Sequence, residues 1–183
     1  MQRLFLAIAL VFSLPASQAA GFTLDSPDIS AGKMIQPPYI YHGFGCTGDN
    51  ISPALDWHNP PEGTRSFAVT VHDPDAPTGG AGFWHWVVIN LPATMTGLAR
   101  GDGTANGSHL PAGAQQIRTD FGTTGWGGPC PPVGDAPHHY HFTVYALKVP
   151  HLDVPANATA SLAGFMINQA ALGKASLTAL YGR

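Results

Sequence analysis

The chain has 183 residues, of which only 10% are charged, and its formal net charge is −3 at pH 7. This balance excludes a broad basic surface for nucleic acid or acidic lipid. The 22 glycines, 17 prolines and 44% of hydrophobic residues are typical of a compact, loop-rich β protein, because a disordered chain has fewer aromatic and β-branched residues.

The N-terminus has the pattern of a secretory signal peptide. Arg3 precedes an apolar run from Leu4 to Leu14, and small residues follow as far as Ala20. The run is too short to cross a bilayer about 30 Å thick, and no later segment reaches ~18 consecutive apolar residues. We therefore expect residues 1–20 to be cleaved and residues 21–183 to form one periplasmic or secreted domain without a stable membrane span.

Three long segments have the pattern of β-strands. In Arg65–His72, apolar side chains alternate with smaller or polar ones, as in a half-buried strand. Trp84–Leu91 is almost continuously apolar, which favours a central strand covered on both faces. His138–Leu147 alternates again. Shorter strands are expected, between turn-forming residues, at Phe22–Leu24, Tyr39–Tyr41, Ala54–Trp57 and Ser176–Tyr181.

One segment, Ala160–Leu172, is predicted to be helical and to pack on the sheet. Its apolar residues recur at helical spacing, and Gly173 is expected to terminate it. The connection from Thr94 to Pro137 is glycine-rich and long for a compact domain, which is typical of a loop that carries function. The expected apolar face of the helix consists of Leu162, Phe165, Met166, Ala170 and Leu172.

Two cysteines, Cys46 and Cys130, would meet an oxidising compartment after secretion. Their spacing along the chain does not determine their distance, so a disulfide and two buried free thiols are both compatible with the sequence. Neither belongs to a close CxxC pair, which disfavours a metal site.

Three short segments can carry polar chemistry near the strand ends. In the Asp73–Pro77 segment, an extended backbone would direct Asp73 and Asp75 into one cavity, whereas a proline-rich turn would use them to cap backbone amides. His85 begins the central strand, where it either meets a ligand or is a buried, neutral core residue. In the loop at Gly127–Pro132, before the third long strand, glycines permit close backbone approach to a ligand and prolines stiffen the wall, or the segment is simply an irregular loop that enters the strand.

Five motifs, in their order along the chain, resemble the phosphatidylethanolamine-binding protein family, and most closely its bacterial Raf kinase inhibitor-like branch. They are NISPAL at 50–55, DPDAP at 73–77, HWVVIN at 85–90, GPCPP at 128–132 and PHHY at 137–140. The resemblance implies a mainly β fold, an antiparallel Greek-key β-sandwich with a few peripheral helices, one of them near the C-terminus. It also implies a non-enzymatic pocket, without a cofactor, for phosphate, acetate or a phosphorylated headgroup.

The resemblance extends to individual pocket positions. Two positions depart from it: Val133 stands where bacterial relatives often have lysine, and His139 stands where the family usually has arginine. Both changes remove a permanent positive charge, so we expect anion binding to be weaker or more dependent on pH. The matching ligand-binding positions are Asp73, Asp75, His85, Gly128, Pro131, Pro132, His138 and Tyr140.

Two carboxylates beside an anion site would repel a dianionic phosphate. The repulsion is removed if the ligand also carries an ammonium group, or if an aspartate stabilises the protonated form of His85 or His138. Tyr140 and the backbone N–H groups near Gly128 can then donate hydrogen bonds. We therefore expect binding to strengthen as the pH falls toward the histidine range near 6.5.

Two other classes of function are compatible with the same residues. Asp73, Asp75, His85 and His138 can bind a divalent metal or act as acid and base, as in a hydrolase, although no GxSxG, HExxH or P-loop motif is present. The family name also allows a secreted inhibitor of a kinase or protease. The natural ligand, any protein target and the oligomeric state, including a homodimer, are left open.

Overall fold

The structure, a computed structural model, describes residues 21–183, so the predicted signal peptide lies outside the described residues. Its strands form a five-stranded, a three-stranded and a two-stranded sheet, and every paired strand is antiparallel. The elements are β1 Thr23–Asp25, a 3₁₀ turn Pro37–Tyr39, β2 His42–Gly43, β3 Cys46–Thr47, β4 Leu55–His58, β5 Ser66–Asp73, β6 Phe83–Pro92, β7 Gly97–Leu98, β8 Gln115–Gln116, β9 His138–Leu147, α1 Ala160–Ala170 and β10 Ala171–Tyr181.

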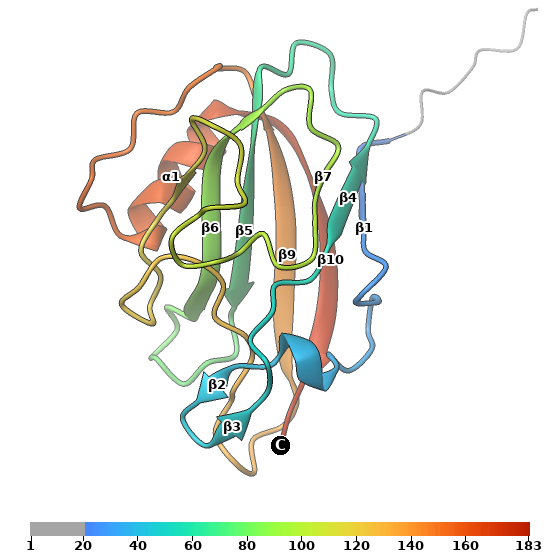
Figure 1. Cartoon of the computed structure of the whole chain (residues 1–183), viewed down its shortest axis with the longest axis vertical. Coiled ribbons are helices and arrows are strands. Elements are labelled where there is room, and N and C mark those ends of the chain that lie inside the picture. The colour runs from blue at the N-terminus through green and yellow to red at the C-terminus, as the bar shows by residue number, and fades with distance from the viewer. Residues whose placement is uncertain (1–20) are drawn as a thin grey trace, which may run out of the picture.

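The five-stranded sheet, in the order β10-β9-β5-β6-β8, is the centre of the molecule (Figure 1). Its strands bury both faces because alternate side chains enter two separate cores. On one face, Phe67 and Val69 of β5 pack with Trp57 of the three-stranded sheet. On the other face, Val87 of β6 packs with Ile167 of α1. The mainly β class, the antiparallel sheets and the helix near the C-terminus are thus confirmed, while the Greek-key detail stays a prediction.

The three long strands predicted from periodicity are confirmed within one residue at each end. Trp86 to Leu91 is buried throughout, as a strand covered on both faces requires. His138–Leu147 alternates only in its first half, because both faces of β9 are buried from Phe142 onward. The long connection from Thr94 to Pro137 contains only the two-residue strands β7 and β8.

The predicted strand at Tyr39–Tyr41 is wrong. Pro37 and Pro38 instead begin a 3₁₀ turn that ends at Tyr39, and Ile40 donates its N–H to the Pro37 carbonyl. Proline presets a φ near −65° and has no N–H for a sheet, so this pair favours the start of a helical turn over a strand.

The helix is confirmed, and Met166 and Ala170 of the expected face pack on the core, but the end of the helix and the rest of that face were predicted incorrectly. It ends at Ala170, and β10 begins at the next residue, so Gly173 lies inside a strand and does not terminate the helix. Leu162 and Phe165 are 42% and 62% exposed. Small residues face the sheet instead, because they allow a closer approach to its bulky side chains. The buried residues of α1 are Ala160, Ala163, Gly164, Ile167 and Ala170.

A disulfide joins Cys46 of β3 to Cys130, with 6.0 Å between the two Cα atoms. This decides the question that spacing left open. Because the two cysteines are 84 residues apart, the bond closes a large loop and ties the β2–β3 hairpin to the segment that precedes β9.

We predict that the Cys46→Ser, Cys130→Ser double variant loses up to about 4.5 kcal/mol of unfolding free energy, from the chain-entropy cost of a loop this long. Urea denaturation at pH 7 measures the loss. Reductant should lower the stability of the native protein and leave the double variant unchanged. Equal stability of the native protein and the double variant in the absence of reductant would contradict the prediction.

Candidate functional site

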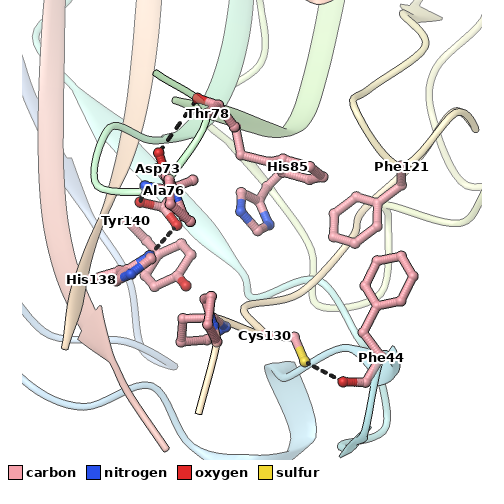
Figure 2. A pocket seen from close by; sticks show the side chains of 13 residues that line it. Phe44, Asp73, Ala76, Thr78, His85, Phe121, Cys130, His138 and Tyr140 are labelled. Carbon is pink, nitrogen blue, oxygen red and sulfur yellow. Dashed lines mark hydrogen bonds and ion pairs between the residues drawn. The ribbon is translucent and has the colours of Figure 1, made fainter. Parts of the chain in front are cut away.

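A cavity of about 150 Å³ opens at the end of the five-stranded sheet where β5 ends and β9 begins (Figure 2). Strands β5, β6 and β9 supply its titratable side chains, and most of its apolar wall comes from the loops around them. The volume suits a compact guest, since pockets for drug-sized molecules are usually ~300–1,000 Å³. The cavity is lined by Phe44, Asp73, Ala76, Pro77, Thr78, Phe83, His85, Phe121, Cys130, Pro131, Pro132, His138 and Tyr140.

A buried ion pair forms one side of the cavity. Asp73 is the last residue of β5 and His138 the first of β9, the neighbouring strand, so the sheet brings them together. Asp73 Oδ2 lies 2.7 Å from His138 Nδ1. Asp73 Oδ1 accepts from the backbone N–H groups of Asp75 and Ala76 at 2.9 and 3.2 Å. The Asp73 carboxylate therefore caps a turn and also pairs with a histidine at the cavity.

The charge of His138 is set by its acidic neighbours. Burial disfavours the imidazolium, but the hydrogen bonds to Asp73 and Asp135 and the charges of Asp73 and Asp75 outweigh it and raise the pKa of His138 above 6.5. The Asp135 carboxylate lies 3.4 Å from His138 Nε2. At neutral pH, His138 is consequently held toward its protonated form, and its charge offsets that of Asp73.

His85 has the opposite electrostatic character. Its side chain is buried, and this burial lowers its pKa to about 4, although the Gly127 carbonyl and the charge of Asp73 act in the other direction. Nδ1 lies 2.6 Å from the Gly127 carbonyl oxygen. Because a carbonyl only accepts, Nδ1 carries the proton and Nε2 is the acceptor of the neutral ring. The hypothesis that His85 acts as an imidazolium is therefore wrong near neutral pH.

Tyr140 contributes a hydroxyl group to the cavity. The side chain is fully buried, and among residues 21–183 its Oη atom has no hydrogen-bond partner. Burial, and then the charge and proximity of the Asp73 carboxylate, raise the pKa of Tyr140, so the hydroxyl stays protonated and can donate. In Figure 2 it lies beside His85 and His138.

The cavity is also lined by three phenylalanines that were not predicted from the sequence. Phe83 and Phe121 meet edge to face with 4.9 Å between ring centroids, and Phe44 lies 6.1 Å from Phe121. Phe44 is 71% exposed and lies in the hairpin that the disulfide ties to Cys130. Phe121 belongs to the long glycine-rich connection. The expectation that this connection carries function was the only signal in the sequence that pointed to it.

Six of the eight predicted positions line the cavity, and two do not. The Asp75 carboxylate is directed elsewhere, where it accepts from the His139 backbone at 2.7 Å and lies 2.8 Å from His139 Nδ1. The prediction that Asp73 and Asp75 face one cavity is therefore wrong, because the proline-rich segment turns after β5. Gly128 packs against the chain near Tyr39, and its N–H donates to Asn50 Oδ1 at 2.8 Å.

The two positions that depart from the family pattern also lie outside the cavity lining. Val133 is 77% exposed, and His139 pairs with the Asp75 carboxylate. Within residues 21–183, no group of three or more His, Cys, Asp or Glu side chains is arranged to hold a metal ion. The same part of the chain contains no helix that is long and apolar enough to span a membrane.

Comparison with known proteins shows the family. The sequence profile described as phosphatidylethanolamine-binding protein matches residues 25–182. The chain belongs to this family.

Relatives match over most of their length. UPF0098 protein YbcL of Escherichia coli is 48% identical over 99% of this chain and 98% of its own length. Its crystal structure, described as a new member of the mammalian family, covers 90% of this chain and 99% of that chain with a TM-score of 0.87 and 49% identity. YbhB of the same organism is 46% identical over 86% of this chain and 98% of its own. A Mycobacterium tuberculosis relative with a lipoprotein name, LppC, is 38% identical over 91% of this chain and 75% of its own.

We predict that burial of neutral His85 makes the fold less stable in mild acid. The unfolded chain takes up a proton as the pH falls below 6.5, while the folded protein does so only near pH 4, so stability falls across this window. Between pH 7 and pH 5 the loss attributable to His85 is about 2 kcal/mol.

Urea denaturation at the two pH values measures this loss. The His85→Gln variant has no titrating ring and should lack that part of the pH dependence, even if it is less stable throughout. An identical change from pH 7 to pH 5 in both proteins would contradict the assignment to His85.

Proposed function

We propose that this chain is a non-enzymatic binding protein whose cavity receives a small anion or a phosphorylated, zwitterionic headgroup. The Tyr140 hydroxyl is the observation that carries this proposal, because it is buried at the cavity without a partner among the described residues. An unpaired buried hydroxyl costs about 1–3 kcal/mol, which a guest with an acceptor oxygen recovers. The oxygens of phosphate and carboxylate groups are such acceptors.

The histidines narrow the chemistry of this guest. Neutral His85 offers the lone pair of Nε2, so a guest that also carries a donor gains a second hydrogen bond. A singly protonated phosphate ester, or a phosphate next to an ammonium group, provides both a donor and acceptors. A bare dianion fits less well, because its oxygens would face the lone pair. Protonated His138 reduces the repulsion by offsetting the charge of Asp73.

The hydroxyl groups at the cavity support binding rather than catalysis. The hydroxyl groups that line the cavity belong to Thr78 and Tyr140. Thr78 Oγ1 donates to the Gly82 carbonyl at 3.0 Å, and Tyr140 Oη makes no hydrogen bond of good geometry among the described residues, although the Asp73 carboxylate is close enough to raise its pKa. An activated nucleophile needs an adjacent base to remove its proton. Neither hydroxyl has this arrangement.

We also propose that the protein acts in the periplasm or is secreted. Three observations support this location: the signal-peptide pattern of residues 1–20, the Cys46–Cys130 disulfide and the lipoprotein name of one relative. Structural disulfides persist in oxidising compartments and are rare in the cytosol.

Tyr140→Phe is predicted to weaken binding of phosphoethanolamine about tenfold, because it removes one hydrogen bond to a charged group, worth about 1.4 kcal/mol. Isothermal titration calorimetry at pH 6.5 measures the affinity. The thermal stability of the free variant should not fall, since the lost hydroxyl has no partner in the protein.

Tyr145→Phe is the matched control for this test. Tyr145 lies on the same strand, but it belongs to the core on the α1 side of the sheet. Its substitution should leave the affinity unchanged. An affinity of the Tyr140→Phe variant equal to that of the native protein, or cleavage of the ligand during titration, would count against the proposed function.

We predict that affinity for a fixed-charge anion falls as the pH rises above the histidine range. Dimethyl phosphate keeps one negative charge across this range, so only the protein titrates. His138 has a raised pKa, and it therefore loses its proton above pH 6.5 and leaves Asp73 uncompensated beside the anion. Calorimetry from pH 6 to pH 9 follows the change.

The His138→Gln variant should bind dimethyl phosphate with an affinity that does not change over the same interval. Circular dichroism at each pH confirms that both proteins stay folded. An affinity that rises with pH, or an equal slope in the variant, would remove His138 from the explanation.

A further inference from the structure

We propose that Asn50 is a positioning residue for the cavity, because its side-chain amide holds the loop whose Gly127 carbonyl orients His85. Asn50 lies in the NISPAL motif and does not line the cavity. The inference adds a residue, and a way to select the ligand, to the proposed binding function. It rests on that function only where ligand affinity is concerned.

A continuous series of hydrogen bonds connects the Asn50 amide to the imidazole. Its Nδ2 donates to the Trp126 carbonyl at 3.2 Å, and its Oδ1 accepts from the Gly128 N–H at 2.8 Å. These two bonds hold the residues on either side of Gly127. Gly127 in turn donates its N–H to the His85 carbonyl at 3.0 Å and accepts from His85 Nδ1 at 2.6 Å.

The backbone at both ends of this series has little freedom. Asn50 has a φ of +54°, in the left-handed region that asparagine tolerates better than most residues. A Cβ atom at Gly128 would lie 2.3 Å from the Tyr39 carbonyl oxygen, so this glycine is packed directly against the neighbouring chain. Asn50 thus fixes the loop at a point where the loop has no space to reorient without losing contacts.

The position of the Gly127 carbonyl decides what His85 offers a ligand. A neutral imidazole can carry its proton on either nitrogen, and the hydrogen bond made by one nitrogen selects the tautomer. With Nδ1–H bound to Gly127, Nε2 is an acceptor. If the loop moved, the proton could occupy Nε2 and convert this acceptor into a donor. Asn50 therefore controls whether the cavity accepts or donates at His85.

Asn50→Gly tests this role, because glycine keeps the left-handed backbone and removes the amide. Nitrogen NMR shifts of the His85 ring, assigned by their loss in His85→Gln, report the tautomer directly. The native ring should be the Nδ1–H form, and the variant should shift toward the Nε2–H form. Affinity for phosphoethanolamine should fall about fivefold, as expected for one weakened hydrogen bond.

Two further variants make the test decisive. Asn59 has a similar φ of +53° and lies at an exposed position outside the cavity lining. Asn59→Gly should therefore leave the His85 tautomer and the affinity unchanged. Asn50→Asp retains the acceptor for Gly128 but loses the donor to Trp126, so its tautomer shift should be intermediate. If Asn50→Gly does not fold, the His85 signals of Asn50→Asp decide.

A native tautomer in the folded Asn50 variants would overturn the positioning role. A shifted tautomer in a protein that never binds phosphoethanolamine would instead support the role of Asn50 and count against the proposed function. A shifted tautomer together with weakened binding supports both.

Discussion

Burial of the central strands on both faces determines where polar groups can lie in this molecule. Strands β5, β6 and β9 pack against a second sheet on one side and against α1 on the other, so their middle sections are mainly apolar, and the buried polar side chains there, such as Thr70 and Thr143, are uncharged. Charged groups cannot be buried there without partners. They gather at the end of the sheet, where Asp73 ends β5, His138 begins β9, and His85 follows the first residues of β6.

Each polar group at this end is then constrained by its surroundings. Asp73 and His138 neutralise each other, and His85 is kept neutral by burial while one nitrogen is held by a backbone carbonyl. Tyr140 alone keeps an unused buried hydroxyl among the described residues. The loops are fixed by covalent and polar links, through the disulfide and through Asn50. These links hold the Tyr140 hydroxyl, a donor, and His85 Nε2, an acceptor, at one cavity.

Local patterns were sufficient to predict the framework. Apolar periodicity identifies the three long strands and the helix, because each element repeats its contact with the core at a fixed spacing. The order of the motifs also predicted the family, which the profile match confirms. Six of the eight predicted positions line one cavity, because the ends of neighbouring strands meet at one edge of the sheet.

The sequence by itself determined where the long strands and the helix lie along the chain, the family and most of the cavity residues. These depend on local spacing and motif identity. Only the tertiary structure decided that Cys46 bonds Cys130, that Asp75 turns away to His139, and that His85 is neutral. The same holds for the small-residue face of α1. These features depend on distances between segments remote in sequence and on how completely water is excluded, and neither quantity is contained in a local pattern.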